Sequence, residues 1–271
     1  MQITHASITN IICIFDENVE FMRFLFLIPF VFVILSCKQE PKQLTAQEII
    51  DKTIENAGGE KYEAATIQFT FRNIKYRSHR EKGNFELSRT IADSLGEIQD
   101  VLTNNGFERL VNGTKLILPD STASKYANSI NSVHYFVQLP YGLNAASVVK
   151  ELVGEAEIDK KKYYEIKVTF SKEGGGMDHD DVYLYWIAQD DFTVDYFAYK
   201  FYTDEGGIRF RKAYNPRNVG GLRFVDYENY KAEPWEFVEL QKVDELFEAG
   251  KLELLSDIKT ENIAVTLSEK Q

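Results

Sequence analysis

The sequence predicts a mainly β protein of the α+β class, built on one large curved antiparallel sheet that forms an unclosed barrel. Three observations predict this fold. Apolar residues alternate with polar ones over many short stretches, turn sequences separate these stretches at hairpin spacing, and helical spacing is confined to a few segments. We expect an N-terminal helix and a helical insertion over the concave face of the sheet.

The N-terminal helix is predicted from its two ends. Thr45 and Glu48 have the spacing of a capping box, in which each side chain binds the backbone amide of the other residue. Isoleucines at positions 49, 50 and 54 then follow at helical spacing. Gly58 and Gly59 predict the end of the helix near Ala57.

The next part of the chain alternates in the manner of antiparallel strands. Ile67, Phe69 and Phe71 begin this pattern, and residues 85–91 repeat it after a turn at 81–84. Asn112-Gly113 predicts a tight hairpin, because this pair tolerates positive φ angles. Residues 120–138 are predicted to be helical, and residues 145–152 to form a short second helix after a break at 139–144.

The second half returns to strands separated by glycine-rich and aspartate-rich turns. The predicted strands are 155–158, 163–170, 182–188, 194–203, 208–214 and 222–230, with a short helix at 243–249 and a last strand near 252. In the stretch 182–187 both alternating sets are apolar, so both faces of the sheet should be covered there. A curved sheet that wraps an apolar interior explains this pattern.

Composition restricts the possible partners. The chain has 271 residues and a net charge of −11, which makes nucleic acid an improbable ligand. Its two cysteines are Cys13 and Cys37. The first lies in a segment that we expect to be removed, so the mature protein should contain no internal disulfide.

Residues 1–36 are predicted to be a lipoprotein signal segment. An apolar run over residues 24–35 follows Arg23 and is too short to cross a bilayer. Residues 34–37 resemble a lipobox, with Ile34 where leucine is commonest, which assigns acylation to Cys37. Translation is predicted to start at Met22, because acidic residues precede it. A buried core helix and a plain secretory signal are the alternatives.

The remaining chain is predicted to be a tether, residues 37–43, followed by a single domain, residues 44–271. Acylated Cys37 would attach the protein to a membrane of the cell envelope, and we expect the outer membrane. The polar residues after Cys37 are compatible with attachment to either face of that membrane, the periplasmic or the surface-exposed one. The acidic domain should stand away from anionic headgroups.

The order of elements resembles the LolA and LolB superfamily of lipoprotein carriers. The resemblance spans about residues 44–231 and is strongest in an uncharacterised lipoprotein branch of unknown function. It is carried by the helix end at 49–59 and by the stretches 174–187 and 207–216. The resemblance implies a half-barrel whose concave, aromatic-lined face holds acyl chains or another apolar ligand beneath helices. A membrane anchor is closer to LolB than to soluble LolA.

An aromatic strip on two neighbouring strands is the candidate ligand-binding surface. Its members are Tyr183, Tyr185, Trp186, Phe197, Tyr199 and Phe201. Arg209 and Arg211 share a strand face, and with Arg223 they could bind a phosphate or carboxylate headgroup. The alternatives are that the aromatic residues only form core, and that the arginines pair with Asp204, Asp226 or Glu228.

The sequence contains no recognisable catalytic motif, so we do not expect an enzyme. Asp178-His179-Asp180-Asp181 has the composition of a metal site, but in an extended strand its side chains point to opposite faces. We therefore predict no metal and no cofactor. An acid pair, Asp226 and Glu228, could support acid–base chemistry but is typical of exposed strand faces.

The leading hypothesis is a membrane-anchored lipoprotein whose half-barrel binds a lipid or other apolar molecule non-covalently. A structural or interaction module of the cell envelope, with its interior filled by its own aromatic rings, is the alternative. An enzyme acting at residues 178–181 is the third hypothesis.

Overall fold

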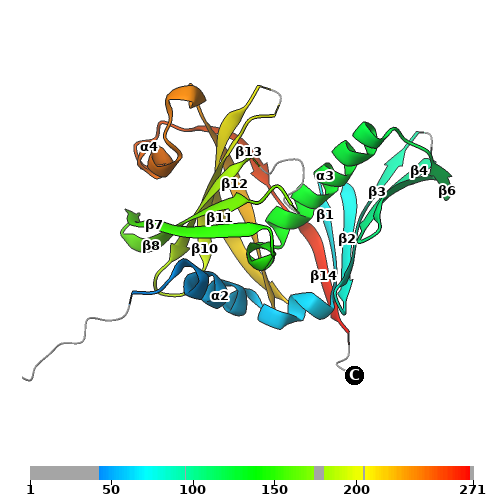
Figure 1. The fold of residues 1–271 in the computed structure, drawn as a ribbon, viewed down its shortest axis with the longest axis horizontal. Helices are drawn as coiled ribbons and strands as arrows, with labels where there is room; N and C mark the ends of the chain where they lie inside the picture. The colour runs from blue at the N-terminus through cyan, green and yellow to red at the C-terminus, as the bar shows by residue number, and fades with distance from the viewer. Residues whose placement is uncertain (1–42, 95, 174–179, 204, 269–271) are drawn as a thin grey trace, which may run out of the picture. The chain divides into compact units, whose positions relative to one another are not determined.

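The computed structural model describes residues 43–268, apart from 95, 174–179 and 204 (Figure 1). The predicted signal segment, Cys37 and most of the tether therefore lie outside the described residues. From Leu44 onward the described residues belong to one compact unit that contains both hydrophobic cores. Among its helices, none has the length and apolarity needed to cross a membrane.

Two antiparallel sheets of seven strands each form the framework, and they do not close into a barrel. Sheet A has the strand order β14-β1-β2-β3-β4-β5-β6, and sheet B has the order β13-β12-β11-β10-β9-β8-β7. The predicted mainly β class is confirmed. The structure refines it, because the strands divide into two curved sheets where the sequence suggested one.

The strands of sheet A come from the N-terminal half, with one from the C-terminus. Their bounds are β1 (Ala65–Phe71), β2 (Ile74–Glu81), β3 (Asn84–Asp93), β4 (Gly96–Thr103), β5 (Gly106–Val111), β6 (Thr114–Leu116) and β14 (Glu261–Leu267). In β1 the predicted alternation is present, since Ile67, Phe69 and Phe71 are buried. Asn112 and Gly113 both have positive φ, as the predicted hairpin requires.

The strands of sheet B come from the second half of the chain. Their bounds are β7 (Val148–Ile158), β8 (Lys161–Phe170), β9 (Val182–Ala188), β10 (Val194–Phe201), β11 (Gly207–Val219), β12 (Leu222–Ala232) and β13 (Glu253–Ile258). The short helix predicted over residues 145–152 is wrong. From Val148 this segment pairs with β8 as an edge strand, and the ladder hydrogen bonds outweigh the weak helical pattern.

The helices cover the two sheets at different places (Figure 1). The α-helices are α2 (Ala46–Ala57), α3 (Asp120–Val137) and α4 (Val243–Glu248), and the 3-10 helices are η1 (Gly59–Ala64), η2 (Tyr141–Asn144), η3 (Trp235–Phe237) and η4 (Leu240–Lys242). The predicted capping box is present, because the Thr45 amide donates to the Glu48 carboxylate at 2.8 Å and the Glu48 amide donates to the Thr45 hydroxyl at 3.2 Å. The predicted helical insertion is α3.

Sheet B is covered on both faces, as the sequence predicted. Its inner face joins residues of sheet A, α2 and α3 in the main core, which includes Phe69, Phe136 and Phe197. Its outer face forms a second core under η4 and α4, where Trp186 and Val243 are fully buried. The inner face is therefore the one that α3 and sheet A enclose.

The two sheets meet where β13 leads into β14. At this seam Asp226 of β12 accepts hydrogen bonds from both terminal nitrogens of Arg217, at 2.7 and 2.8 Å, and from the backbone amide of Thr260 at 3.0 Å. Arg217 also donates to the Thr260 hydroxyl at 2.8 Å. Asp226 is thus used for structure, and it does not act with Glu228 as the free acid pair considered from the sequence.

Candidate functional site

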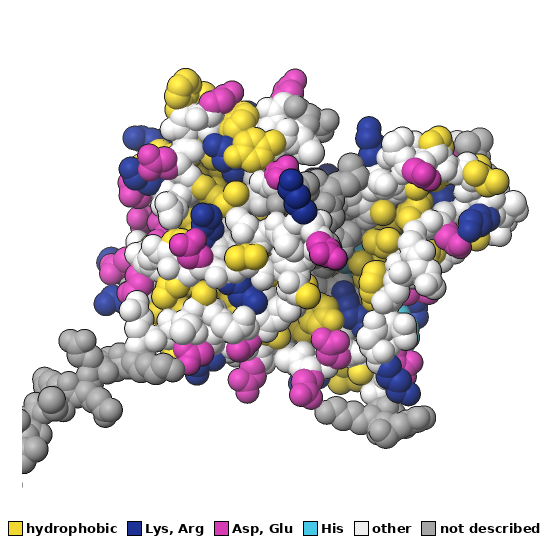
Figure 2. Space-filling view, viewed as in Figure 1, with side chains coloured by type: hydrophobic (Ala, Val, Ile, Leu, Met, Phe, Trp, Pro, Cys, Tyr) yellow, Lys and Arg dark blue, Asp and Glu magenta, His cyan; other side chains and the backbone are white. Residues whose placement is uncertain are grey.

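The first cavity lies between α3 and the inner face of sheet B, and its volume is about 300 Å³. Figure 2 shows the surface hollowed at the centre of the molecule, with hydrophobic side chains visible inside the hollow. The lining residues come from α3, from strands β8 to β11 and from the segments just before β9 and just after β10, and they are Asn128, Asn131, Ser132, Tyr135, Phe136, Phe170, Asp181, Tyr183, Phe197, Tyr199, Phe201, Thr203 and Arg211. The cavity combines aromatic walls with a few polar groups.

Strand register brings the aromatic wall together. Tyr199 of β10 lies opposite Tyr183 of β9, and their rings stack with centroids 5.2 Å apart. Phe197 and Phe201 flank Tyr199 on the same face of β10, because alternate residues of a strand share a face. The structure brings these four residues of the predicted strip together, and all of them line the cavity.

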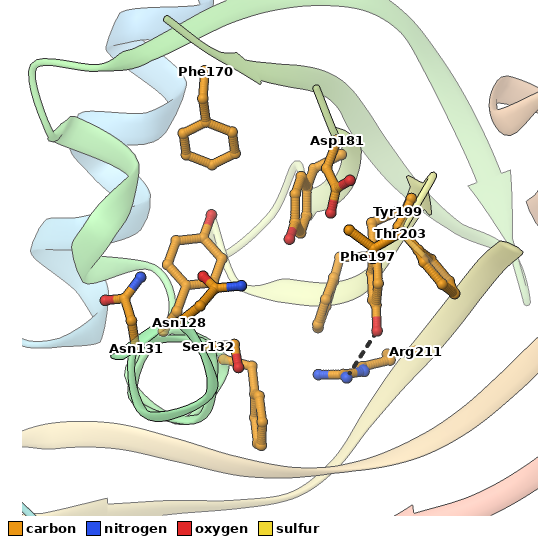
Figure 3. A pocket seen from close by; sticks show the side chains of 13 residues that line it. Asn128, Asn131, Ser132, Phe170, Asp181, Phe197, Tyr199, Thr203 and Arg211 are labelled. Carbon is orange, nitrogen blue, oxygen red and sulfur yellow. Dashed lines mark hydrogen bonds between the residues drawn. The ribbon is translucent and has the colours of Figure 1, made fainter. Parts of the chain in front are cut away.

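Arg211 enters the same wall from β11, directly opposite Phe197 in the register. Its guanidinium carbon lies 4.8 Å from the ring centroid of Phe136 and 5.2 Å from that of Phe197. One terminal nitrogen donates to the Tyr199 hydroxyl at 3.2 Å, as Figure 3 shows. No acidic side chain in the described part of the chain forms an ion pair with Arg211. Among the described residues, the guanidinium therefore contacts aromatic rings and a hydroxyl in the cavity wall.

Helix α3 supplies the opposite wall with polar side chains (Figure 3). Asn128, Asn131, Ser132 and Tyr135 are spaced by three and four residues, so they share one face of the helix. The sequence analysis predicted the helix but did not single out this face. The polar spacing on a helix that also buries Ile130 and Val133 is the signal that could have identified it.

An ionic network under α3 positions this wall. Asp100 of β4 is fully buried and binds Arg89 at 2.8 Å and Arg109 through both carboxylate oxygens. Arg109 stacks on the ring of Tyr126 at 3.7 Å, and Arg89 donates to the Ser129 hydroxyl at 2.9 Å. Both arginines thus connect one carboxylate of sheet A to the helix.

Three of the predicted site residues do not line the cavity. Tyr185 lies on the correct face but is fully buried below the surface, and burial raises the pKa of its phenol. Arg209 stacks on Phe201 at 5.1 Å without reaching the cavity. Trp186 points to the opposite face, where it packs against Phe210 in the second core, because neighbouring residues of a strand alternate.

The other candidate residues from the sequence do not form one cluster in the described part of the chain. Of the predicted acidic cluster, residues 178 and 179 lie outside the described residues, whereas Asp181 is buried and lines the cavity. The described residues include no group of three or more His, Cys, Asp or Glu side chains that could hold a metal ion. Arg223 does not join Arg211, since it pairs with Asp195 at 3.8 Å.

Comparison with known proteins gives a family and two similar structures. The model of a family of unknown function, DUF6503, matches residues 22–260. A search of curated proteins finds no match. A crystal structure of the LolA superfamily protein NE2245 from Nitrosomonas europaea is similar with a TM-score of 0.46 and 13% identity, covering 84% of this chain and 96% of that chain.

A second similar structure is a DUF1329 family protein from Desulfovibrio piger, with a TM-score of 0.40 and 12% identity, covering 82% of this chain and 93% of that chain. The family match agrees with the part of the sequence prediction that assigned the chain to a family of unknown function.

Proposed function

The chain belongs to the DUF6503 family of unknown function, and from its own cavity we propose that it binds a lipid or another apolar molecule non-covalently. The observation that supports this proposal most is the aromatic wall of Tyr183, Phe197, Tyr199 and Phe201 around an open volume of about 300 Å³. Small-molecule sites are typically concave, mostly apolar and between about 300 and 1,000 Å³. The sequence resemblance to lipoprotein carriers implies a ligand of the same kind.

The energy for such binding would come from burial of apolar surface. Each methylene group removed from water contributes about 0.8 kcal/mol, so an acyl chain needs no specific chemistry to be retained. Arg211 and the amides of Asn128 and Asn131 would orient the polar end of the ligand. In this proposal the protein is a binder and not an enzyme, and it needs no cofactor.

The proposal includes attachment to a membrane. Acylated Cys37 would hold the domain at the cell envelope through the tether of residues 37–43. An anchored binder would receive, present or sense its ligand beside one membrane, with no need to cross the periplasm.

A packing observation supports one alternative. Tyr185, Phe197 and Tyr227 are buried, and the Phe197 ring stacks on Tyr185 and packs edge to face against Tyr227, so much of the interior is filled by the protein's own rings. A structural or interaction module of the cell envelope would need only such packing. The two functions differ in whether the remaining cavity takes up a ligand.

The test is native mass spectrometry with lipid extraction, on the full-length protein isolated gently from its own envelope fraction. Ser132→Phe fills the cavity from the exposed side of α3, and Ser124→Phe makes the same change at an exposed position of α3 outside the lining. We expect bound lipid in the wild type and in Ser124→Phe, and its loss in Ser132→Phe. A ligand-free wild type, or equal lipid in both variants, would support the structural module.

A further inference from the structure

A second cavity lies on the other side of the α3 C-terminus and has a volume of about 420 Å³. It shares Asn131, Tyr135 and Phe170 with the first cavity, so the two are neighbours. Its walls are apolar at Phe85, Leu87, Val148 and Phe170. Its polar wall is formed by Arg80, His134 and Gln138, with Glu63 also at the lining.

Arg80 of β2 is the cation of this cavity. One of its terminal nitrogens donates to the Gln138 side-chain oxygen at 2.6 Å and lies 3.5 Å from the Ser78 hydroxyl. Its guanidinium stacks on the ring of Tyr141 at 4.6 Å, and Tyr141 stacks in turn on Tyr62 at 5.1 Å. All of these partners are neutral. In the described residues no carboxylate lies within ion-pair distance of Arg80.

A chain of neutral groups fixes the direction of this guanidinium. The Gln138 amide nitrogen donates to the Ser78 hydroxyl at 3.2 Å and faces His134 Nδ1 at 3.0 Å. Burial lowers the pKa of His134 to about 3, so the imidazole is neutral and Nδ1 accepts. Nε2 then carries the proton and donates to the Ser88 carbonyl at 3.3 Å. With its nitrogen so engaged, Gln138 turns its oxygen to Arg80.

A guanidinium held in this way forms no ion pair within the described residues, and the charge of Glu63 at the same cavity offsets its own only in part. Burial lowers the pKa of Arg80, which reflects the cost of keeping its charge away from water. An oxyanion is the group that best removes that cost, because a guanidinium binds a carboxylate or phosphate through charge-assisted hydrogen bonds. Glu63 adds a negative charge at the same cavity, and its repulsion favours a monoanion over a dianion.

We propose that the second cavity binds the carboxylate of an amphipathic acid, with Arg80 holding the carboxylate and Phe85, Leu87, Val148 and Phe170 covering the apolar chain. This site is distinct from the first cavity and goes beyond the proposed function. The hydrogen bonds through Gln138 and His134 fix the position of the Arg80 guanidinium, so the bound acid has one orientation, with its carboxylate at Arg80.

Calorimetric titration of the chain from Lys38 onward tests the site with three probes. Dodecanoate below its micelle concentration carries both parts of the ligand, dodecanol lacks the charge, and acetate lacks the chain. We expect dodecanoate to bind at least tenfold more tightly than either of the other probes. Arg80→Gln should weaken dodecanoate at least tenfold and change dodecanol by less than threefold. Equal affinity for dodecanoate and dodecanol in the wild type would overturn the proposal.

Matched variants locate the binding without relying on Arg80. Ala145 is exposed and lines the second cavity, whereas Ala146 is equally exposed in the same segment but does not line it. Ala145→Trp should abolish dodecanoate binding, and Ala146→Trp should leave it unchanged. Glu63→Gln should strengthen dodecanoate binding about threefold by removing the like charge. A purely structural role for Arg80 predicts no change from Glu63→Gln.

The first cavity provides the last control. Ser132→Phe should leave dodecanoate binding unchanged, because Ser132 lines only the first cavity. If Ser132→Phe abolishes binding and Ala145→Trp does not, dodecanoate occupies the first cavity and the second-cavity proposal is wrong. Conversely, loss of envelope lipid without loss of dodecanoate binding would separate the two proposals.

Discussion

The hydroxyls of Tyr135 on α3 and Tyr185 on β9 form a hydrogen bond of 2.7 Å, which joins the helix to the inner face of sheet B. Burial raises the pKa of both phenols, so both remain protonated at neutral pH. Each hydroxyl therefore depends on the other as a partner.

Removal of one of these hydroxyls should destabilise the protein more than removal of both. Tyr185→Phe leaves the Tyr135 hydroxyl buried without this partner, at an expected cost of about 1–3 kcal/mol. The double change to Phe should be close to the wild type. Urea unfolding of the four proteins measures the coupling, and additive losses would contradict the proposed link between helix and sheet.

Acid should weaken the fold through His134. Its pKa is about 3 in the native state against 6.5 ordinarily, so the unfolded chain binds this proton at a higher pH. The free energy of unfolding should therefore fall as pH decreases from 6.5 to 3, by on the order of 1 kcal/mol per pH unit. Unfolding series at several pH values check this slope. His134→Gln should flatten it, and an unchanged slope would assign the effect to other groups.

The effect of Glu165 on the pH dependence of stability should be opposite to that of His134. Burial, and next the charge of Asp244, raise the pKa of Glu165 to about 7 from 4.5, so the native state holds this proton more tightly than the unfolded state. Stability from this group is present below pH 4.5 and is lost as pH rises through 7. Glu165→Gln should therefore stabilise the protein at pH 8. The exposed Glu157→Gln serves as control, and equal melting shifts in both variants would refute the assignment.

Asp100 should be the most sensitive charged position. Asp100→Asn leaves Arg89 and Arg109 without their shared carboxylate, and loss of one partner from a buried ionic network costs about 3–5 kcal/mol. Hydrogen exchange of the α3 backbone amides should also be faster in Asp100→Asn than in the wild type. Glu108→Gln breaks only an exposed pair with Lys115 and should cost about 1 kcal/mol or less. Similar effects from both changes would argue against the role of the network.

The proposed membrane anchor can be tested at Cys37. Cys37→Ser should remove the acyl chains and move the protein from the membrane fraction to the soluble fraction. Intact mass and fractionation measure both effects. Cys13→Ser is the control, because that residue precedes the predicted cleavage site and should not alter the mature protein. Retention of Cys37→Ser in the membrane would point to another mode of attachment.

Local sequence signals predicted the elements better than their assembly. The capping box at Thr45, the hairpin at Asn112 and the two covered faces of sheet B follow from short-range geometry, and all three are present. The division into two sheets depends on contacts such as Asp226 with Thr260, far apart in sequence. Val148 was misassigned for the same reason, since only its partner strand decides its conformation.

The sequence predicted the strand residues of the candidate site better than its helix residues, because strand alternation is a short-range pattern and contacts between a helix and a sheet are not. Strand alternation correctly joined Tyr183 to Tyr199, and applied strictly it also separates Trp186 from them. The α3 wall and the Arg80 cavity required knowledge of which strands the helix crosses. No periodicity in the sequence contains that information.

The seam between the sheets determines how the cavities can respond to a ligand. Within the described residues no backbone ladder joins sheet A to sheet B, and the chain passes between them near Thr260. A change in the angle between the sheets therefore breaks no strand pairing, and it is resisted only by side-chain packing and the helices. We therefore expect this joint to act as a hinge held by side-chain contacts, which would allow the cavities to accept ligands of different width.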